Sequence, residues 1–116
     1  MSHEISELQQ TLRQFANERD WEQFHTPKNL ATALSVEAAE LLEHFQWLTA
    51  EQSRSIPTDK RAAIAHEIAD VFLYLLQLSD KLDIDILAAA RNKIQLNGAK
   101  YPADKAKGSM KKYTEL

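Results

Sequence analysis

Apolar side chains recur at spacings of three and four residues along most of the chain, which is the period of an amphipathic helix. The first such stretch carries Ile5, Leu8, Leu12 and Phe15 on one face. Together the stretches predict helices over about residues 3–18, 28–48, 58–82 and 84–96. Four helices of this length favour an all-α protein with a four-helix bundle-like protomer.

Polar residues at the edges of these stretches predict where the helices begin and end. Thr26 is expected to cap the second helix, with Pro27 in its first turn. The residues from 19 to 27 are too irregular for a helix. The candidates for the later boundaries are Thr58 or Asp59 for the third helix, Asp83 or Asp85 for the fourth, and Asn97-Gly98 as a stop signal.

Composition supports long helices in one domain. The chain has 116 residues, of which 44% are hydrophobic, and only 2 Gly and 3 Pro, so residues that break helices are scarce. It has no Cys, which excludes a disulfide framework and a thiolate site. We expect a single helical domain over 1–116, of which 98–116 is a basic C-terminal tail.

The charge distribution argues against duplex nucleic acid as a partner. The net charge is −3, from 17 acidic and 14 basic residues, which leaves no broad basic surface. Basic residues gather over 91–112, as expected either for a solvated tail or for a phosphorylated ligand held through metal. They are Arg91, Lys93, Lys100, Lys105, Lys107, Lys111 and Lys112.

The sequence also argues against a membrane protein. The N-terminal residues are polar and lack the apolar centre of a signal peptide. No uninterrupted apolar run approaches the roughly 18 residues that a membrane span needs. We therefore expect a cytoplasmic protein.

One acidic residue of the second helix breaks the apolar pattern. Glu37 falls within the apolar stripe of this helix when each residue advances the helix by about 100°. Glu40 lies at the edge of the stripe, whereas Glu43 lies on the opposite side, where a solvated acid belongs. An ionised carboxylate on a buried face is costly unless it is paired or bound to metal. The position of Glu37 therefore needs an explanation, such as an ion pair or a bound metal ion.

The third helix repeats this arrangement. Glu67, Asp70 and Tyr74 follow one another at spacings of three and four along the flank of its apolar stripe. Two such helices side by side would aim Glu37, Glu40, Glu67 and Asp70 at one point. A divalent cation relieves the repulsion among them, and all-oxygen ligands favour Mg²⁺ or Mn²⁺.

Two other interpretations of these carboxylates are available. They could be ordinary surface acids, some of them paired with Lys60, Arg61 or Arg91. A di-iron bundle would need two E-x-x-H motifs on inward helical faces. The only such spacing here runs from Glu22 to His25, in the irregular segment, so di-iron chemistry is disfavoured.

The motifs resemble those of the MazG-like all-α nucleotide pyrophosphohydrolases. The signature of that family is E-x-x-E followed on the next helix by E-x-x-D, and here it reads Glu37-Ala38-Ala39-Glu40 and Glu67-Ile68-Ala69-Asp70. Further blocks resemble the dCTP pyrophosphatase branch of the family. These blocks are residues 18–25, 45–47, 100–102 and 112–116, so the resemblance covers nearly the whole chain.

The resemblance implies roles for particular side chains. Glu37, Glu40, Glu67 and Asp70 would bind Mg²⁺, with Mn²⁺ as a substitute, and form the catalytic group. The implied substrate-binding residues are Trp21, His25, Trp47, Tyr74, Lys93 and Asn97. Each also has a structural interpretation, such as a core aromatic, a surface lysine or a helix cap. Animal members of the branch carry a histidine where this chain has Leu12, which leaves the base preference open.

The implied activity is hydrolysis of dCTP, or of modified dCTP, to the monophosphate and pyrophosphate by metal-activated attack of water at the α-phosphate. Two alternatives stay open: a related pyrophosphohydrolase for dUTP or a damaged nucleotide, and a non-catalytic helical interaction module. Since small helical chains seldom bury two apolar helices alone, we expect a homo-oligomer. The resemblance implies a dimer or a tetramer built as a dimer of dimers.

Overall fold

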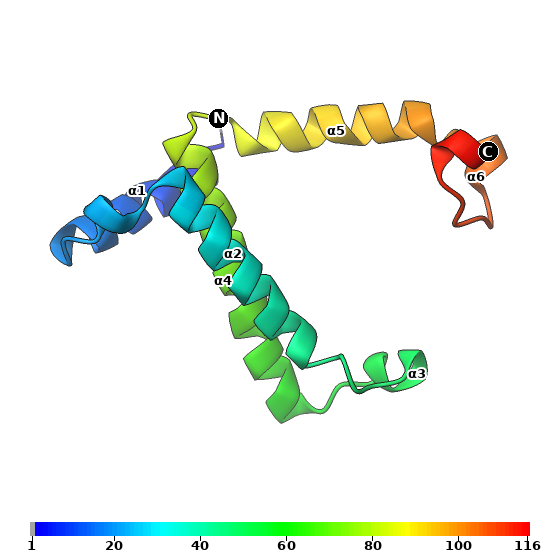
Figure 1. Ribbon diagram of the computed structural model, residues 1–116, viewed down its shortest axis with the longest axis horizontal. Helices are drawn as coiled ribbons and strands as arrows, with labels where there is room; N and C mark the ends of the chain where they lie inside the picture. Colours follow the sequence, from blue (N-terminus) through cyan, green and yellow to red (C-terminus); the bar gives the residue numbers. More distant parts are fainter. Residues whose placement is uncertain (1) are drawn as a thin grey trace. The chain divides into compact units, whose positions relative to one another are not determined.

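The computed structural model describes residues 2–116, and these residues form helices and turns without any strand. The long helices are α1 (His3–Glu18), α2 (Pro27–Glu43), α4 (Thr58–Lys81) and α5 (Ile86–Lys100) (Figure 1). The shorter ones are η1 (Glu22–Phe24), α3 (Ala50–Ser53), α6 (Ala103–Ala106) and η2 (Tyr113–Glu115). The expected all-α class is confirmed. The helices are divided between two compact units, residues 2–84 and residues 85–116.

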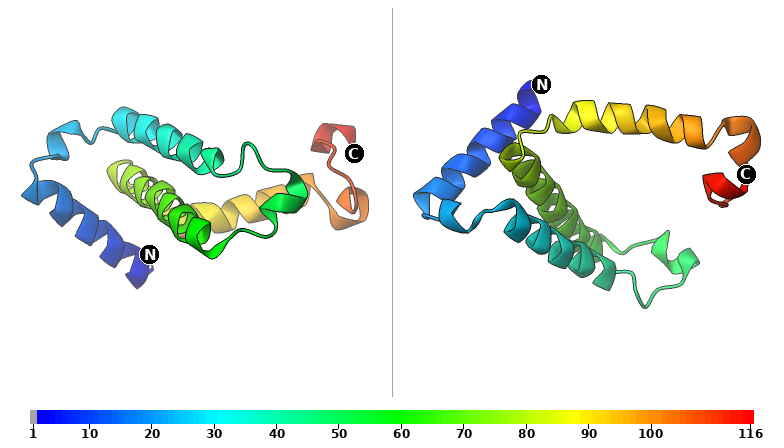
Figure 2. Two further views of the ribbon diagram at one scale, coloured as in Figure 1. Left: turned by 90° about the horizontal axis from the view of Figure 1, so that it is seen from below. Right: turned by 45° about the horizontal axis from the view of Figure 1, so that its top comes forward.

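In the first unit, α2 and α4 lie side by side and α1 packs against α4 (Figures 1 and 2). Leu30 of α2 and Leu76 of α4 are fully buried. The buried amide of Gln9 in α1 donates through Nε2 to the Leu76 carbonyl at 3.0 Å and to Ser79 Oγ at 3.3 Å. These hydrogen bonds hold α1 to the C-terminal half of α4, and they orient the segment that follows α1.

In the second unit, Asp85 caps α5 by accepting a hydrogen bond from the Ala88 amide at 3.1 Å. The residues after α5 are folded as well. The Tyr101 and Tyr113 rings meet edge to face at 6.0 Å, and Lys100 Nζ lies 5.0 Å from the centre of the Tyr113 ring. The basic segment 98–116 thus contains local aromatic contacts.

The helix boundaries agree with the sequence in part. Thr26 caps α2 by accepting from the Asn29 amide at 3.2 Å, as expected, and Pro27 begins the helix. The third predicted helix, α4, has the expected span, but its N-cap residue is Pro57, so the expectation that Thr58 or Asp59 caps it is wrong.

The predicted helix 28–48 ends early, at Glu43. Tighter turns follow, in which the His44 amide donates to the Leu41 carbonyl and the Phe45 amide donates to the Leu42 carbonyl. These turns keep the apolar spacing of a helix although the α-helix has ended, so the sequence pattern predicts a helix that is too long.

The predicted stop at Asn97-Gly98 is wrong, because α5 continues to Lys100. The Tyr101 amide donates to the Asn97 carbonyl at 2.9 Å, which extends the helical ladder past both residues. A glycine ends a helix by adopting a left-handed conformation. Among the described residues, the glycine with positive φ is Gly108, at 74°, so Gly98 does not provide that signal.

Apolar side chains remain on the surface of α2 and α4. Val36, Leu42, Ile68 and Phe72 are each at least 40% exposed. α4 also contains an 18-residue window with a mean hydropathy of 1.3, so by length and composition alone it could cross a membrane. Core helices of soluble proteins pass the same test. In this chain 17% of that window is buried, α4 packs against α1 and α2, and its flank carries carboxylates.

Candidate active site

Three carboxylates from two helices meet in the first unit. Glu37 projects from α2, and Glu67 and Asp70 project from α4. Each offers one oxygen, and these three oxygens lie within 4.8 Å of one another. The side-by-side packing of α2 and α4 creates this cluster, because the two motifs lie at matching heights on adjacent helices. Of the four carboxylates that were predicted to converge, Glu37, Glu67 and Asp70 therefore meet in this group.

Glu40 lies beside this cluster and acts on it electrostatically. Desolvation, followed by hydrogen bonding with Glu67 and Glu40, raises the pKa of Glu37 from 4.5 to about 7. The negative charges of Glu40 and Asp70 raise it further. Such a shift means that the metal-free cluster binds a proton near neutral pH, since four carboxylates this close cannot all ionise without cost.

The cluster contains buried oxygens without hydrogen bonds. Oε2 of Glu37 and Oε2 of Glu67 are buried and find no hydrogen-bond partner among residues 2–116. A buried acceptor without a partner is costly, and a bound cation would satisfy both oxygens. The donors are all carboxylate oxygens, the ligands that hard divalent cations prefer. The residues therefore fit a divalent metal ion.

A pocket of about 320 Å³ opens beside Asp70, and it contains three of the predicted substrate-binding residues, Trp21, His25 and Tyr74. The Trp21 ring packs edge to face against Phe15 at 5.8 Å and against His25 at 6.4 Å. The full lining is Thr11, Leu12, Phe15, Ala16, Trp21, His25, Asp70, Leu73, Tyr74 and Gln77. The lining of this pocket thus combines aromatic rings with one carboxylate of the cluster.

Tyr74 connects the pocket to the carboxylates. Burial raises the pKa of its hydroxyl above the ordinary value, and the charges of Glu37, Asp70 and Glu40 raise it further. The hydroxyl therefore stays protonated at neutral pH and can donate a hydrogen bond to a ligand.

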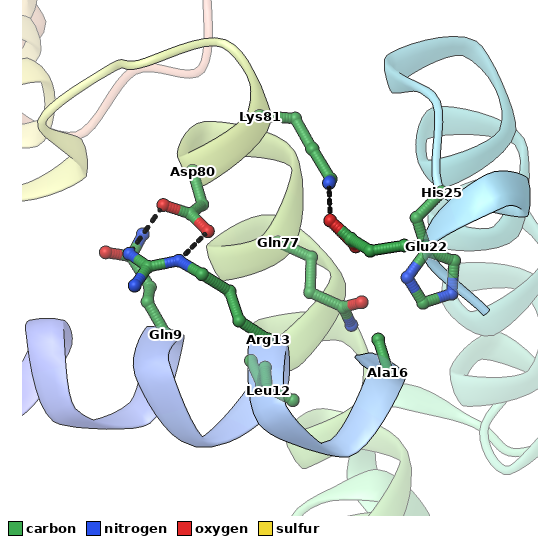
Figure 3. A pocket seen from close by; sticks show the side chains of 9 residues that line it. All are labelled: Gln9, Leu12, Arg13, Ala16, Glu22, His25, Gln77, Asp80 and Lys81. Carbon is green, nitrogen blue, oxygen red and sulfur yellow. Dashed lines mark hydrogen bonds and ion pairs between the residues drawn. The ribbon is translucent and has the colours of Figure 1, made fainter. Parts of the chain in front are cut away.

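The segment that carries Trp21 and His25 is held by polar contacts at Trp21 and Glu22, near its start. The Trp21 amide donates to the Ala16 carbonyl at 2.9 Å, which turns the chain back after α1. Glu22 forms an ion pair with Lys81 of α4, and Arg13 forms a two-point ion pair with Asp80 at 2.7 and 2.9 Å (Figure 3). These contacts fix the aromatic wall relative to the helix that bears Glu67 and Asp70.

The remaining predicted residues lie outside this pocket. Trp47 follows α2 and is 86% exposed. Lys93 and Asn97 are exposed on α5, in the second unit. Their proposed contacts with substrate stay predictions.

The structure adds residues to the pocket that motif matching did not identify. Leu73 and Gln77 line it from α4, and Thr11 and Phe15 line it from α1. The signal for Gln77 is present in the sequence, because it continues the spacing of Asp70 and Tyr74 along one helical face.

Comparison with known proteins gives consistent matches. Residues 32–116 match the family described as the MazG-like family. The dCTP pyrophosphatase 1 of Homo sapiens is 40% identical over 114 residues, which cover 97% of this chain and 67% of the relative, and that of Mus musculus is equally similar. The crystal structure of a pyrophosphatase from Archaeoglobus fulgidus superimposes with a TM-score of 0.81 at 41% identity. That match covers 88% of this chain and 95% of the other.

Proposed function

Because the chain belongs to the MazG-like family, we propose that it is a nucleoside triphosphate pyrophosphohydrolase that converts dCTP to dCMP and pyrophosphate. The observation that carries the proposal is the meeting of Glu37, Glu67 and Asp70 within 4.8 Å, with Asp70 also lining an aromatic pocket. Carboxylates that hold a cation next to an aromatic surface suit a ligand with phosphates at one end and a base at the other.

Mg²⁺ is the proposed ion, with Mn²⁺ as a substitute. The all-oxygen donor set of Glu37, Glu40, Glu67 and Asp70 agrees with either. When bound, such an ion would supply positive charge for the triphosphate and would make an attacking water more acidic.

The chain's own residues would orient the substrate and move a proton. One carboxylate of the group accepts the proton of the attacking water as general base. The Trp21 ring offers an apolar face to the base, and the protonated Tyr74 hydroxyl donates a hydrogen bond near the carboxylates. His25 adds a polar edge beside Trp21.

Trp47, Lys93 and Asn97 are proposed as further substrate contacts. Lys93 would hold a phosphate as a point charge, and Asn97 offers both a donor and an acceptor for a base or sugar edge. We also propose that residues 1–116 act as one domain within a cytoplasmic homo-oligomer, a dimer or a dimer of dimers. The exposed apolar side chains of α2 and α4 support association, since such surfaces are costly in water.

The proposal predicts a ranking of substrates. With Mg²⁺ present, kcat/KM for pyrophosphate release should be higher for dCTP than for dATP or dGTP, because polar groups in the pocket select the base edge. The measurement is steady-state kinetics with the four deoxynucleoside triphosphates and dUTP. If a purine nucleotide ranks first, the dCTP assignment is wrong. If no nucleotide is hydrolysed, the chain is a non-catalytic helical module.

A further inference from the structure

Four polar residues follow one face of α4 from the carboxylate cluster into the pocket. They are Glu67, Asp70, Tyr74 and Gln77, at spacings of three, four and three. The last three all line the same pocket. Gln77 lies about 10 Å beyond Asp70 along the helix axis, at roughly 1.5 Å per residue. A nucleotide with its phosphates at the carboxylates would therefore extend its base toward Gln77.

Most of the other polar groups in this pocket already have a role. The Thr11 hydroxyl donates to the Glu7 carbonyl at 2.9 Å, and Asp70 belongs to the carboxylate cluster. The Tyr74 hydroxyl lies in the field of those carboxylates. His25 packs edge to face with Trp21. Besides His25, whose ring nitrogens stay available beside Trp21, Gln77 is the polar residue of the pocket that lies farthest along α4 from the carboxylates.

The side-chain amide of Gln77 forms a hydrogen bond through its nitrogen and leaves its oxygen without a partner among the described residues. Its Nε2 donates to the Leu73 carbonyl, one turn earlier in α4, over a long 3.4 Å. Its Oε1 accepts no hydrogen bond from residues 2–116. Figure 3 shows a neighbouring pocket that Gln77 also lines, and there its side chain extends from α4 toward Ala16 and His25. All three residues line the aromatic pocket as well. Gln77 therefore offers an acceptor to a ligand.

We propose that Gln77 is a specificity-determining residue, whose Oε1 accepts a hydrogen bond from the 4-amino group of a cytosine base bound in this pocket. This inference rests on the proposed function. Cytosine presents a donor at position 4, whereas uracil presents a carbonyl acceptor at that position. An acceptor facing an acceptor leaves both groups unpaired, and a buried polar group without a partner is penalised.

The hydrogen bond to Leu73 favours one of the two orientations of the Gln77 amide and so determines which bases it selects. A freely rotating amide could turn by 180° and offer its NH₂ group to the uracil carbonyl instead. The Nε2 donation to the Leu73 carbonyl favours the orientation in which Oε1 is left for the ligand. The apolar side chains of Leu12, Phe15 and Leu73 around it reduce competition from water.

The test is the ratio of kcat/KM for dCTP to kcat/KM for dUTP in the parent enzyme and in variants. Gln77→Met keeps an unbranched side chain and removes the amide. We expect the ratio to fall roughly tenfold or more, mainly through slower turnover of dCTP. Gln77→Glu keeps an acceptor oxygen and should retain a preference for dCTP, even if its charge slows both substrates. Gln77→Ala is the second variant if Gln77→Met does not fold.

The control is Gln14→Met, since Gln14 is an exposed glutamine of α1 that does not line this pocket. It should leave the ratio unchanged. An unchanged ratio in Gln77→Met, or an equal fall for dCTP, dUTP and the purine nucleotides, would overturn the inference while leaving the pyrophosphohydrolase activity in place. A parent that hydrolyses dUTP as well as dCTP contradicts it too. A parent that releases no pyrophosphate from any nucleotide shows instead that the proposed function has failed.

Discussion

Glu37→Gln is expected to lower kcat for dCTP by more than about 100-fold while the helices remain folded. Loss of groups that only support metal ligands costs about 10–100-fold, so loss of a ligand should cost at least as much. Glu37 is the carboxylate that α2 contributes to the trio with Glu67 and Asp70, and its Oε2 has no hydrogen bond within residues 2–116. Glutamine keeps the shape and removes the charge. The measurement is kcat with saturating Mg²⁺, together with circular dichroism.

The same variant should change the pH dependence of stability in the metal-free protein. The pKa of Glu37 is about 7 in the folded chain and 4.5 ordinarily, so the folded chain holds a proton that the unfolded chain releases. The free energy of unfolding should therefore fall as pH rises from about 4.5 to 7. Glu37→Gln removes this group, so the metal-free variant should lose less stability over that range, as measured by denaturant unfolding in EDTA.

Glu43→Gln provides the matched control, because Glu43 ends the same helix and is exposed. It should keep near-parental kcat and the parental pH dependence of unfolding. Equal losses of activity at Glu37 and Glu43 would contradict the placement of the site.

Removal of divalent metal should abolish activity and make the protein less stable. Without a cation, the carboxylates of Glu37, Glu40, Glu67 and Asp70 repel one another and two of their buried oxygens lack partners. We expect no measurable hydrolysis of dCTP in EDTA and full recovery with excess Mg²⁺ or Mn²⁺. Added Mg²⁺ should also raise the melting temperature, because an ion that binds the folded chain stabilises it by mass action.

A rise in melting temperature with Mg²⁺ alone would show that the carboxylates bind the ion without nucleotide. An ion that binds only as a complex with the nucleotide would give no such rise. In Glu37→Gln the rise should be smaller, and in Glu43→Gln it should equal that of the parent. Hydrolysis that continues in metal-free buffer would show that the carboxylate cluster has another purpose.

The sequence predicted the helices of the first unit well because their apolar faces are regular. It predicted the carboxylate trio because Glu37 lies within an apolar stripe, and a charge at such a position needs a physical reason. The periodicity could not locate the end of α2, since the turns after Glu43 keep the same apolar spacing. It also could not show that Asn97 and Gly98 lie inside α5, because glycine is compatible with both a helix and a stop.

The pocket could not be predicted from the sequence, because it forms only when the helices pack. Trp21 and His25 stand in an irregular segment, and only the packing of α1 against α4 places them beside Tyr74. Gln77 continues the helical spacing of Asp70 and Tyr74, but a solvated helix face can show the same spacing, so the sequence signal for Gln77 is weak. Trp47 lies in the turn after α2, where it is 86% exposed and does not line this pocket.

Cleavage of a nucleoside triphosphate between the α- and β-phosphates is tested most directly by identification of the products. Purified protein is incubated with dCTP and Mg²⁺, and the nucleotides and phosphates are separated and quantified. We expect dCMP and pyrophosphate in equal amounts, without dCDP, and with Glu37→Gln a more than about 100-fold slower release of both. Release of dCDP and inorganic phosphate, or dCTP recovered intact with the parent protein, would contradict the proposed reaction.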